Sequence, residues 1–127
     1  MAQILLVEDD SFISLFLESK LKEKGHTVTV AQDTKAAEKA LKSATPDLVL
    51  LDIILPDESG FKLLERMKAA KEWSAVPVVI LSNLGQETEI EEGKRLGAVE
   101  FLVKGNYSPE EIVDRVANIL EQTNKAV

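Results

Sequence analysis

Four segments of the chain end an apolar run in polar side chains that could do chemistry. They are Glu8 and Asp9 after residues 4–7, Asp52 after residues 48–51, Ser82 after residues 76–81, and Lys104 after residues 99–103. An ionised carboxylate is costly to bury unless it is paired or bound to a metal. Acids at the ends of apolar runs therefore call for a partner of opposite charge.

The residue types favour a divalent cation together with a phosphoryl group. Carboxylates that lie close together repel one another unless a cation joins them. Magnesium prefers one or two carboxylates, several waters and often a phosphate. The ammonium of Lys104 could meet one phosphoryl oxygen, and the hydroxyl of Ser82 could donate a hydrogen bond to another. No cysteine is present and the one histidine, His26, follows no apolar run, so a zinc site is not expected.

The elements that must position these residues alternate along the chain. We expect strands at residues 3–7, 27–31, 48–52, 76–81 and 99–103, and helices at residues 11–24, 33–42, 60–70, 87–96 and from the Ser108 cap onward. The first, third and fourth strands are almost wholly apolar, as parallel strands covered on both faces are. The alternation predicts a parallel sheet with helices on both faces. In such sheets ligands bind outside the carboxyl ends of the strands, which is where the polar residues stand.

Length and composition narrow the class of protein. The 127 residues suffice for one domain, expected to span residues 1–127. No apolar run approaches the roughly 20 residues that a membrane span needs. The N-terminus lacks the basic region of a signal peptide, so we expect a cytoplasmic protein. The net charge of −7 argues against direct binding of nucleic acid by this chain.

Four motifs in a fixed order resemble the receiver domain of two-component response regulators, in its single-domain, chemotaxis-regulator-like form. They are "ILLVEDD", "DLVLLDIILPDESG", "VPVVILSN" and "GAVEFLVKG", and the resemblance runs from Ile4 to about Leu120. It implies an α/β fold of the flavodoxin-like, doubly wound (βα)5 type. The five-stranded parallel sheet would have the strand order 2-1-3-4-5.

The resemblance also implies a role for each matching residue. Asp52 would accept the phosphoryl group, with Asp9, Asp52 and the backbone carbonyl of Ile54 binding Mg2+ directly, Glu8 acting mostly through water, Ser82 and Lys104 contacting the phosphoryl group, and Phe101 turning as the switch aromatic. The donor would be a sensor histidine kinase or a phosphotransfer protein. The face made by helix 87–96, strand 99–103 and the last helix would bind a downstream protein. The chain would not be an enzyme beyond its own phosphorylation and dephosphorylation.

One residue departs from the family pattern and keeps an alternative open. Gly105 follows Lys104, where the family usually has a proline joined by a cis peptide. A cis bond before a residue other than proline costs about 2.5–4 kcal/mol, so we expect a trans bond here. The alternative is a degenerate receiver that serves only as a docking module, without phosphotransfer. A flavodoxin or a phosphatase is a third reading, disfavoured because no glycine-rich loop follows the first strand and no Asp-x-Asp follows any strand.

Overall fold

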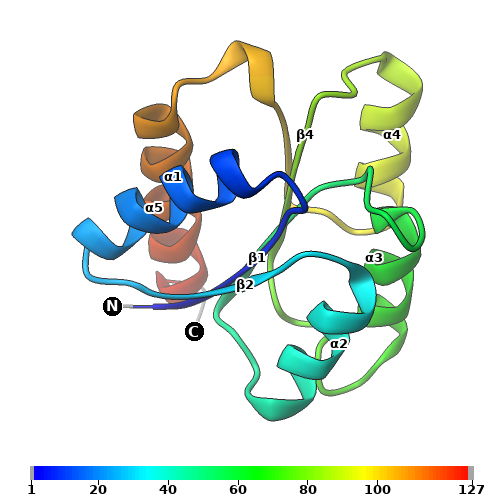
Figure 1. Ribbon diagram of the computed structural model, residues 1–127. Helices are drawn as coiled ribbons and strands as arrows, with labels where there is room; N and C mark the ends of the chain where they lie inside the picture. The colour runs from blue at the N-terminus through cyan, green and yellow to red at the C-terminus, as the bar shows by residue number, and fades with distance from the viewer. Residues whose placement is uncertain (1, 126–127) are drawn as a thin grey trace.

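Five parallel strands form one sheet in the computed structural model, which describes residues 2–125 (Figure 1). The strands are β1 (Gln3–Val7), β2 (Thr27–Ala31), β3 (Leu48–Leu51), β4 (Val78–Ser82) and β5 (Glu100–Val103). Their order across the sheet is β2-β1-β3-β4-β5. The predicted fold class and the predicted strand order are therefore confirmed.

The helices cover both faces of this sheet. They are α1 (Ser11–Glu23), α2 (Thr34–Ser43), α3 (Gly60–Ala69), α4 (Glu87–Arg95) and α5 (Pro109–Lys125), with a short 3-10 helix, η1 (Lys104–Asn106), after β5. Helices α1 and α5 lie together on one face, and α2, α3 and α4 lie on the other (Figure 1). Within residues 2–125, none of the helices has the length and apolar character needed to cross a membrane.

Covering both faces explains why the central strands are almost wholly apolar, with only Gln3 at the start of β1 and Ser82 at the end of β4 as polar residues. In β1, Leu5 and Val7 point into the core beneath α2 and α3, whereas Ile4 and Leu6 point into the core beneath α1 and α5. Burying one such side chain contributes about 1.5–3 kcal/mol relative to leaving it exposed. The strand is therefore held from both sides, and the polar residues after it start from a rigid base.

The observed boundaries of β4 differ from the expected ones at both of its ends. Strand β4 begins at Val78 and includes Ser82, which we expected to follow the strand. Pro77 has no N–H to donate to the neighbouring strand, although its carbonyl still accepts a hydrogen bond from the Val49 N–H. The 3-10 helix η1 was not predicted. No peptide bond in residues 2–125 is cis, so the bond between Lys104 and Gly105 is trans, as expected.

Candidate functional site

Glu8 and Asp52 stand side by side because neighbouring strands deliver them in register. Val7 of β1 pairs with Leu51 of β3, and each acid is the next residue along its strand. The backbone hydrogen bonds continue one step past the strands. The Glu8 N–H donates to the Ala31 carbonyl at 2.9 Å, and the Asp52 N–H donates to the Val7 carbonyl at 3.0 Å. Sheet geometry alone therefore places two carboxylates next to each other.

Lys104 reaches these two carboxylates from the end of β5, the strand at one edge of the sheet. It directly follows β5, and its Nζ lies 2.6 Å from Glu8 Oε2 and 3.1 Å from Asp52 Oδ2. The three side chains are nearly buried, with exposed fractions of 10% for Lys104, 2% for Glu8 and 8% for Asp52. Buried charges are costly unless opposite charges pair with them, so the three side chains form one buried ion-pair cluster.

Asp9 adds a third carboxylate at the open edge. Glu8, Asp9 and Asp52 each offer one oxygen, and these oxygens all lie within 4.8 Å of one another. Asp9 is exposed to solvent, whereas the other two acids are buried. Three hard oxygen donors, of which one reaches water, fit a divalent cation that retains part of its hydration shell. The site can therefore hold a divalent metal ion.

The charges of Glu8 and Lys104 respond to burial and to each other. Burial raises the pKa of Glu8 above its ordinary value, and the neighbouring charge of Asp52 adds to this, against the lowering effect of Lys104. Burial opposes the charge of Lys104, but its contacts with Glu8 and Asp52 outweigh burial and raise the pKa of Lys104. Lys104 thus stays charged and keeps its contact with Asp52 at neutral pH.

The loop after Asp52 folds back over the end of β3. The Ile54 N–H donates to Asp52 Oδ1 at 3.2 Å, and Ile54 forms an isolated antiparallel bridge with Ser59. The Gly60 N–H donates to the Ile53 carbonyl at 2.7 Å, which brings the first turn of α3 against the strand end. Asp52 Oδ1 is therefore oriented by the backbone, while Oδ2 faces Lys104.

Ser82 and Phe101, the two predicted switch residues, occupy packed positions nearby. Ser82 is completely buried as the last residue of β4, and its Oγ accepts a hydrogen bond from the Leu84 N–H at 3.4 Å. No hydrogen bond joins Ser82 to Asp52 or Lys104 among the described residues. Phe101 is half-buried and packs against the core beneath α2, α3 and α4. The switch role of both residues stays a prediction.

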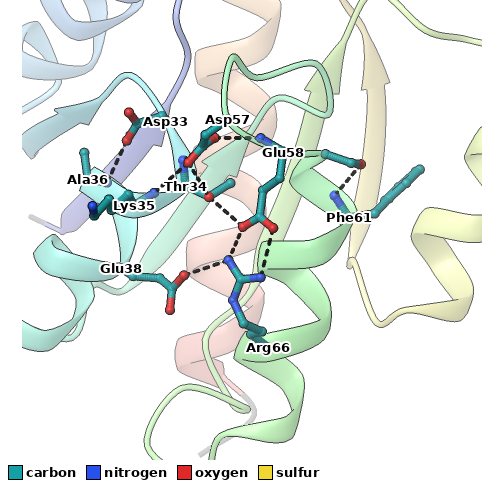
Figure 2. A network of polar contacts seen from close by, with 10 residues as sticks. Asp33, Thr34, Lys35, Ala36, Glu38, Asp57, Glu58, Phe61 and Arg66 are labelled. Atoms are coloured by element: carbon teal, nitrogen blue, oxygen red, sulfur yellow. Dashed lines mark hydrogen bonds and ion pairs between the residues drawn. The ribbon is translucent and has the colours of Figure 1, made fainter.

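A second polar cluster lies beside the loop and was not predicted from the sequence. Five residues, here called the loop network, connect α2, the loop and α3: Thr34, Glu38, Asp57, Glu58 and Arg66 (Figure 2). The acids at positions 57 and 58 are visible in the sequence. Thr34 stands 23 residues before Asp57, and no local pattern connects two positions so far apart.

The chain is similar in sequence to known proteins. Residues 4–117 match the response regulator receiver domain family. PilH of Pseudomonas aeruginosa is 36% identical over 104 residues, covering 82% of this chain and 86% of PilH. The phosphate regulon transcriptional regulatory protein PhoB of the same organism is 32% identical over 120 residues, covering 94% of this chain and 52% of PhoB. The chain spans about half the length of several other curated relatives that it matches.

One similar solved structure contains a bound metal ion. The structure of the Mn2+-bound form of response regulator Rcp1 superposes with a TM-score of 0.81 at 26% identity. The match covers 94% of this chain and 91% of that chain. A protein of the same architecture thus binds a divalent cation.

Proposed function

Because the chain belongs to the response regulator receiver domain family, we propose that it is a phosphorylation-dependent signalling switch whose phosphoryl acceptor is Asp52. One observation carries the proposal: Lys104 contacts Asp52 within a cluster of three carboxylates at the carboxyl edge of the sheet. This arrangement combines a nucleophilic oxygen, a fixed positive charge and a place for a metal ion. Phosphoryl transfer depends mainly on such positioning and charge neutralisation.

The residues that would hold a Mg2+ ion are those with suitable oxygens at this edge. Asp9 and Asp52 would bind directly through carboxylate oxygens, the backbone carbonyl of Ile54 would supply another ligand, and Glu8 would act through water. When bound, the cation would neutralise negative charge on the group being transferred. The carboxylate cluster and the Mn2+-bound relative support this assignment.

The chemical step would use the two oxygens of Asp52 differently. A carboxylate oxygen attacks phosphorus, so that an oxygen–phosphorus bond forms while the nitrogen–phosphorus bond of a phosphohistidine donor breaks. The Ile54 N–H orients Oδ1 at 3.2 Å. Lys104 is already within 3.1 Å of Oδ2 and can pass its contact to a phosphoryl oxygen without a large movement. Water would later hydrolyse the acyl phosphate in the same site.

The donor would be a sensor histidine kinase or a phosphotransfer protein that approaches over α1. Three large apolar side chains of this helix are exposed, Phe12 at 78%, Leu15 at 68% and Phe16 at 43%. An apolar groove between Phe12 and Tyr107 reaches Lys104, so a docked helix would lie beside the acceptor.

The output would be a change of the face made by α4, β5 and α5. The phosphoryl group would draw the Ser82 hydroxyl toward it, and Phe101 would turn into the vacated space. Phe101 lies against α4 at Gly93, where a Cβ would be 3.1 Å from the ring. Gly93 is also the one residue of α4 that is buried, so this helix is weakly held and can respond.

Phosphorylation by a small donor tests the proposal. Incubation with a small phosphodonor and Mg2+ should raise the intact mass of the wild type by one phosphoryl group, and Asp52→Asn should abolish the gain. Asp114→Asn is the matched control, because Asp114 is an exposed acid on α5 and should leave the gain intact. An unchanged mass of the wild type would refute the proposal and favour the docking module.

A further inference from the structure

The loop between Asp52 and α3 is tied at its tip to the start of α2 by Asp57 (Figure 2). Asp57 Oδ1 accepts the Thr34 N–H at 3.2 Å, and Oδ2 accepts the Thr34 hydroxyl at 2.7 Å and the Lys35 N–H at 3.1 Å. The N–H groups of Thr34 and Lys35 are the first two of α2, and they have no partner inside the helix. A carboxylate at a helix N-terminus is also favoured by the helix dipole. Asp57 therefore completes the start of α2 from a different segment of the chain.

The next residue extends the tie to α3. Glu58 contacts Arg66 through both carboxylate oxygens, and Arg66 reaches Glu38 of α2 at 2.6 Å. Thr34 Oγ1 lies 2.7 Å from Asp57 Oδ2 and 2.7 Å from Glu58 Oε2. A hydroxyl has one proton, so it serves only one of these carboxylates at a time. The buried Thr34, which is 2% exposed, is thus the shared donor at the centre of the loop network.

The near end of the loop is attached to the site itself. The Ile54 N–H is bound to Asp52 Oδ1, and the bridge between Ile54 and Ser59 closes the loop into a narrow turn. Along the chain, the carbonyl of Ile54 follows these contacts and precedes Asp57 by three residues. The direction of this carbonyl depends on backbone dihedrals that are fixed only if both ends of the segment are held.

We propose that Asp57, held by Thr34, is a positioning residue that orients the backbone carbonyl of Ile54 for binding a divalent cation. The inference rests on the proposed function, because it takes that carbonyl as a ligand of the cation. Removing Asp57 frees the tip of the loop and leaves the first N–H groups of α2 to water. The carboxylates of Glu8, Asp9 and Asp52 remain in place, so cation binding weakens without being lost.

The affinity for Mn2+ tests the inference without any measurement of phosphorylation. Free Mn2+ is followed by electron paramagnetic resonance at constant ionic strength. Tryptophan fluorescence is a poor reporter of this site, because Trp73 precedes β4 and so lies at the opposite edge of the sheet. Asp57→Ala should weaken Mn2+ binding about tenfold, the lower end of the loss seen when residues supporting a metal ligand are removed. Thr34→Val removes one hydrogen bond and no charge, and should weaken binding in the same direction by less.

Asp33→Ala is the matched control for both helix stability and charge. Asp33 caps the same helix by accepting the Ala36 N–H at 2.7 Å and carries the same charge, but it makes no hydrogen bond to the described residues of the loop. It should leave the Mn2+ affinity at the wild-type value. A loss equal to that of Asp57→Ala would overturn the inference, because the cause would then be helix stability or general electrostatics.

The remaining outcomes also decide the matter. Wild-type affinity in Asp57→Ala would overturn the inference and leave the proposed function intact. If circular dichroism shows that Asp57→Ala does not fold, the isosteric Thr34→Val decides, and an unchanged dissociation constant in that variant would overturn the inference. A wild type that binds no Mn2+ would sink the proposed function and this inference together.

Discussion

Gly60 is the position where one added methyl group should do most damage. A Cβ at this position would lie 2.1 Å from the carbonyl oxygen of Asp52, and 3.0 Å from both the carbonyl carbon of Asp52 and the Cα of Ile53. The first distance is 1.3 Å shorter than the 3.4 Å at which ordinary contact begins. All three atoms belong to the backbone, so no flexible side chain can move aside.

The expected cost of Gly60→Ala follows from what must shift. Either the start of α3 or the end of β3 has to move by about an ångström, and overpacking of this kind costs about 1–3 kcal/mol. The shift also breaks the hydrogen bond from the Gly60 N–H to the Ile53 carbonyl at 2.7 Å, which is worth about 1 kcal/mol. We expect a loss of about 2–4 kcal/mol, a large part of the about 5–15 kcal/mol that stabilises a typical domain.

Urea denaturation followed by circular dichroism measures this loss. Gly105→Ala is the matched control, because a Cβ there would meet nothing within 4 Å, and its free energy of unfolding should stay within about 0.5 kcal/mol of the wild type. The phosphoryl gain of Gly60→Ala should fall as well, since the displaced backbone carries Asp52. A free energy of unfolding for Gly60→Ala as close to the wild type as that of the control would refute the reasoning.

Three further predictions concern charge and packing. Hydrogen bonds from Thr34 and Lys35 outweigh the effect of burial and lower the pKa of Asp57 from 3.8 to about 2. The stability that Asp57 contributes is therefore present above pH 3.8, and the advantage of the wild type over Asp57→Asn should shrink as the pH falls toward 2; denaturation curves that keep it constant would contradict this. The raised pKa of Glu8 has the opposite sign, because the folded state holds this proton more tightly than the unfolded state does. In thermal melts without divalent cations, the stability of Glu8→Gln relative to the wild type should therefore increase as the pH rises above 4.5. A stability difference that stays constant with pH would contradict this prediction. Gly93→Ala would place a Cβ 2.7 Å from Ile80 Cδ1 and 3.1 Å from the Phe101 ring, so it should crowd both side chains and shift the Phe101 ring resonances in NMR spectra. The stability change should stay within about 1 kcal/mol, because the gain in helix propensity opposes the crowding; unchanged resonances would rule out the contact.

The sequence by itself determined the element types and the edge where chemistry is concentrated. Apolar runs of strand length can be recognised because a strand segment buried on both faces admits no polar residue, as in β3 and in the part of β1 that follows Gln3. The polar residue that ends each run is equally local information. Glu8, Asp9, Asp52 and Lys104 could therefore be assigned to one edge from the alternation of strands and helices alone.

Only the tertiary structure decided which of these groups touch and what supports them. Lys104 reaches Glu8 across 96 positions of sequence, and the contact depends on strand order and side-chain reach. The bond between Asp57 and Thr34 is likewise invisible in the sequence, because each residue alone is an ordinary turn or cap residue. Local patterns reflect the periodicity of one element, whereas contacts between loops arise from the packing of several elements at once. That is why the sequence could place these acids and the lysine at one edge of the sheet, whereas the network that holds the loop was not predicted.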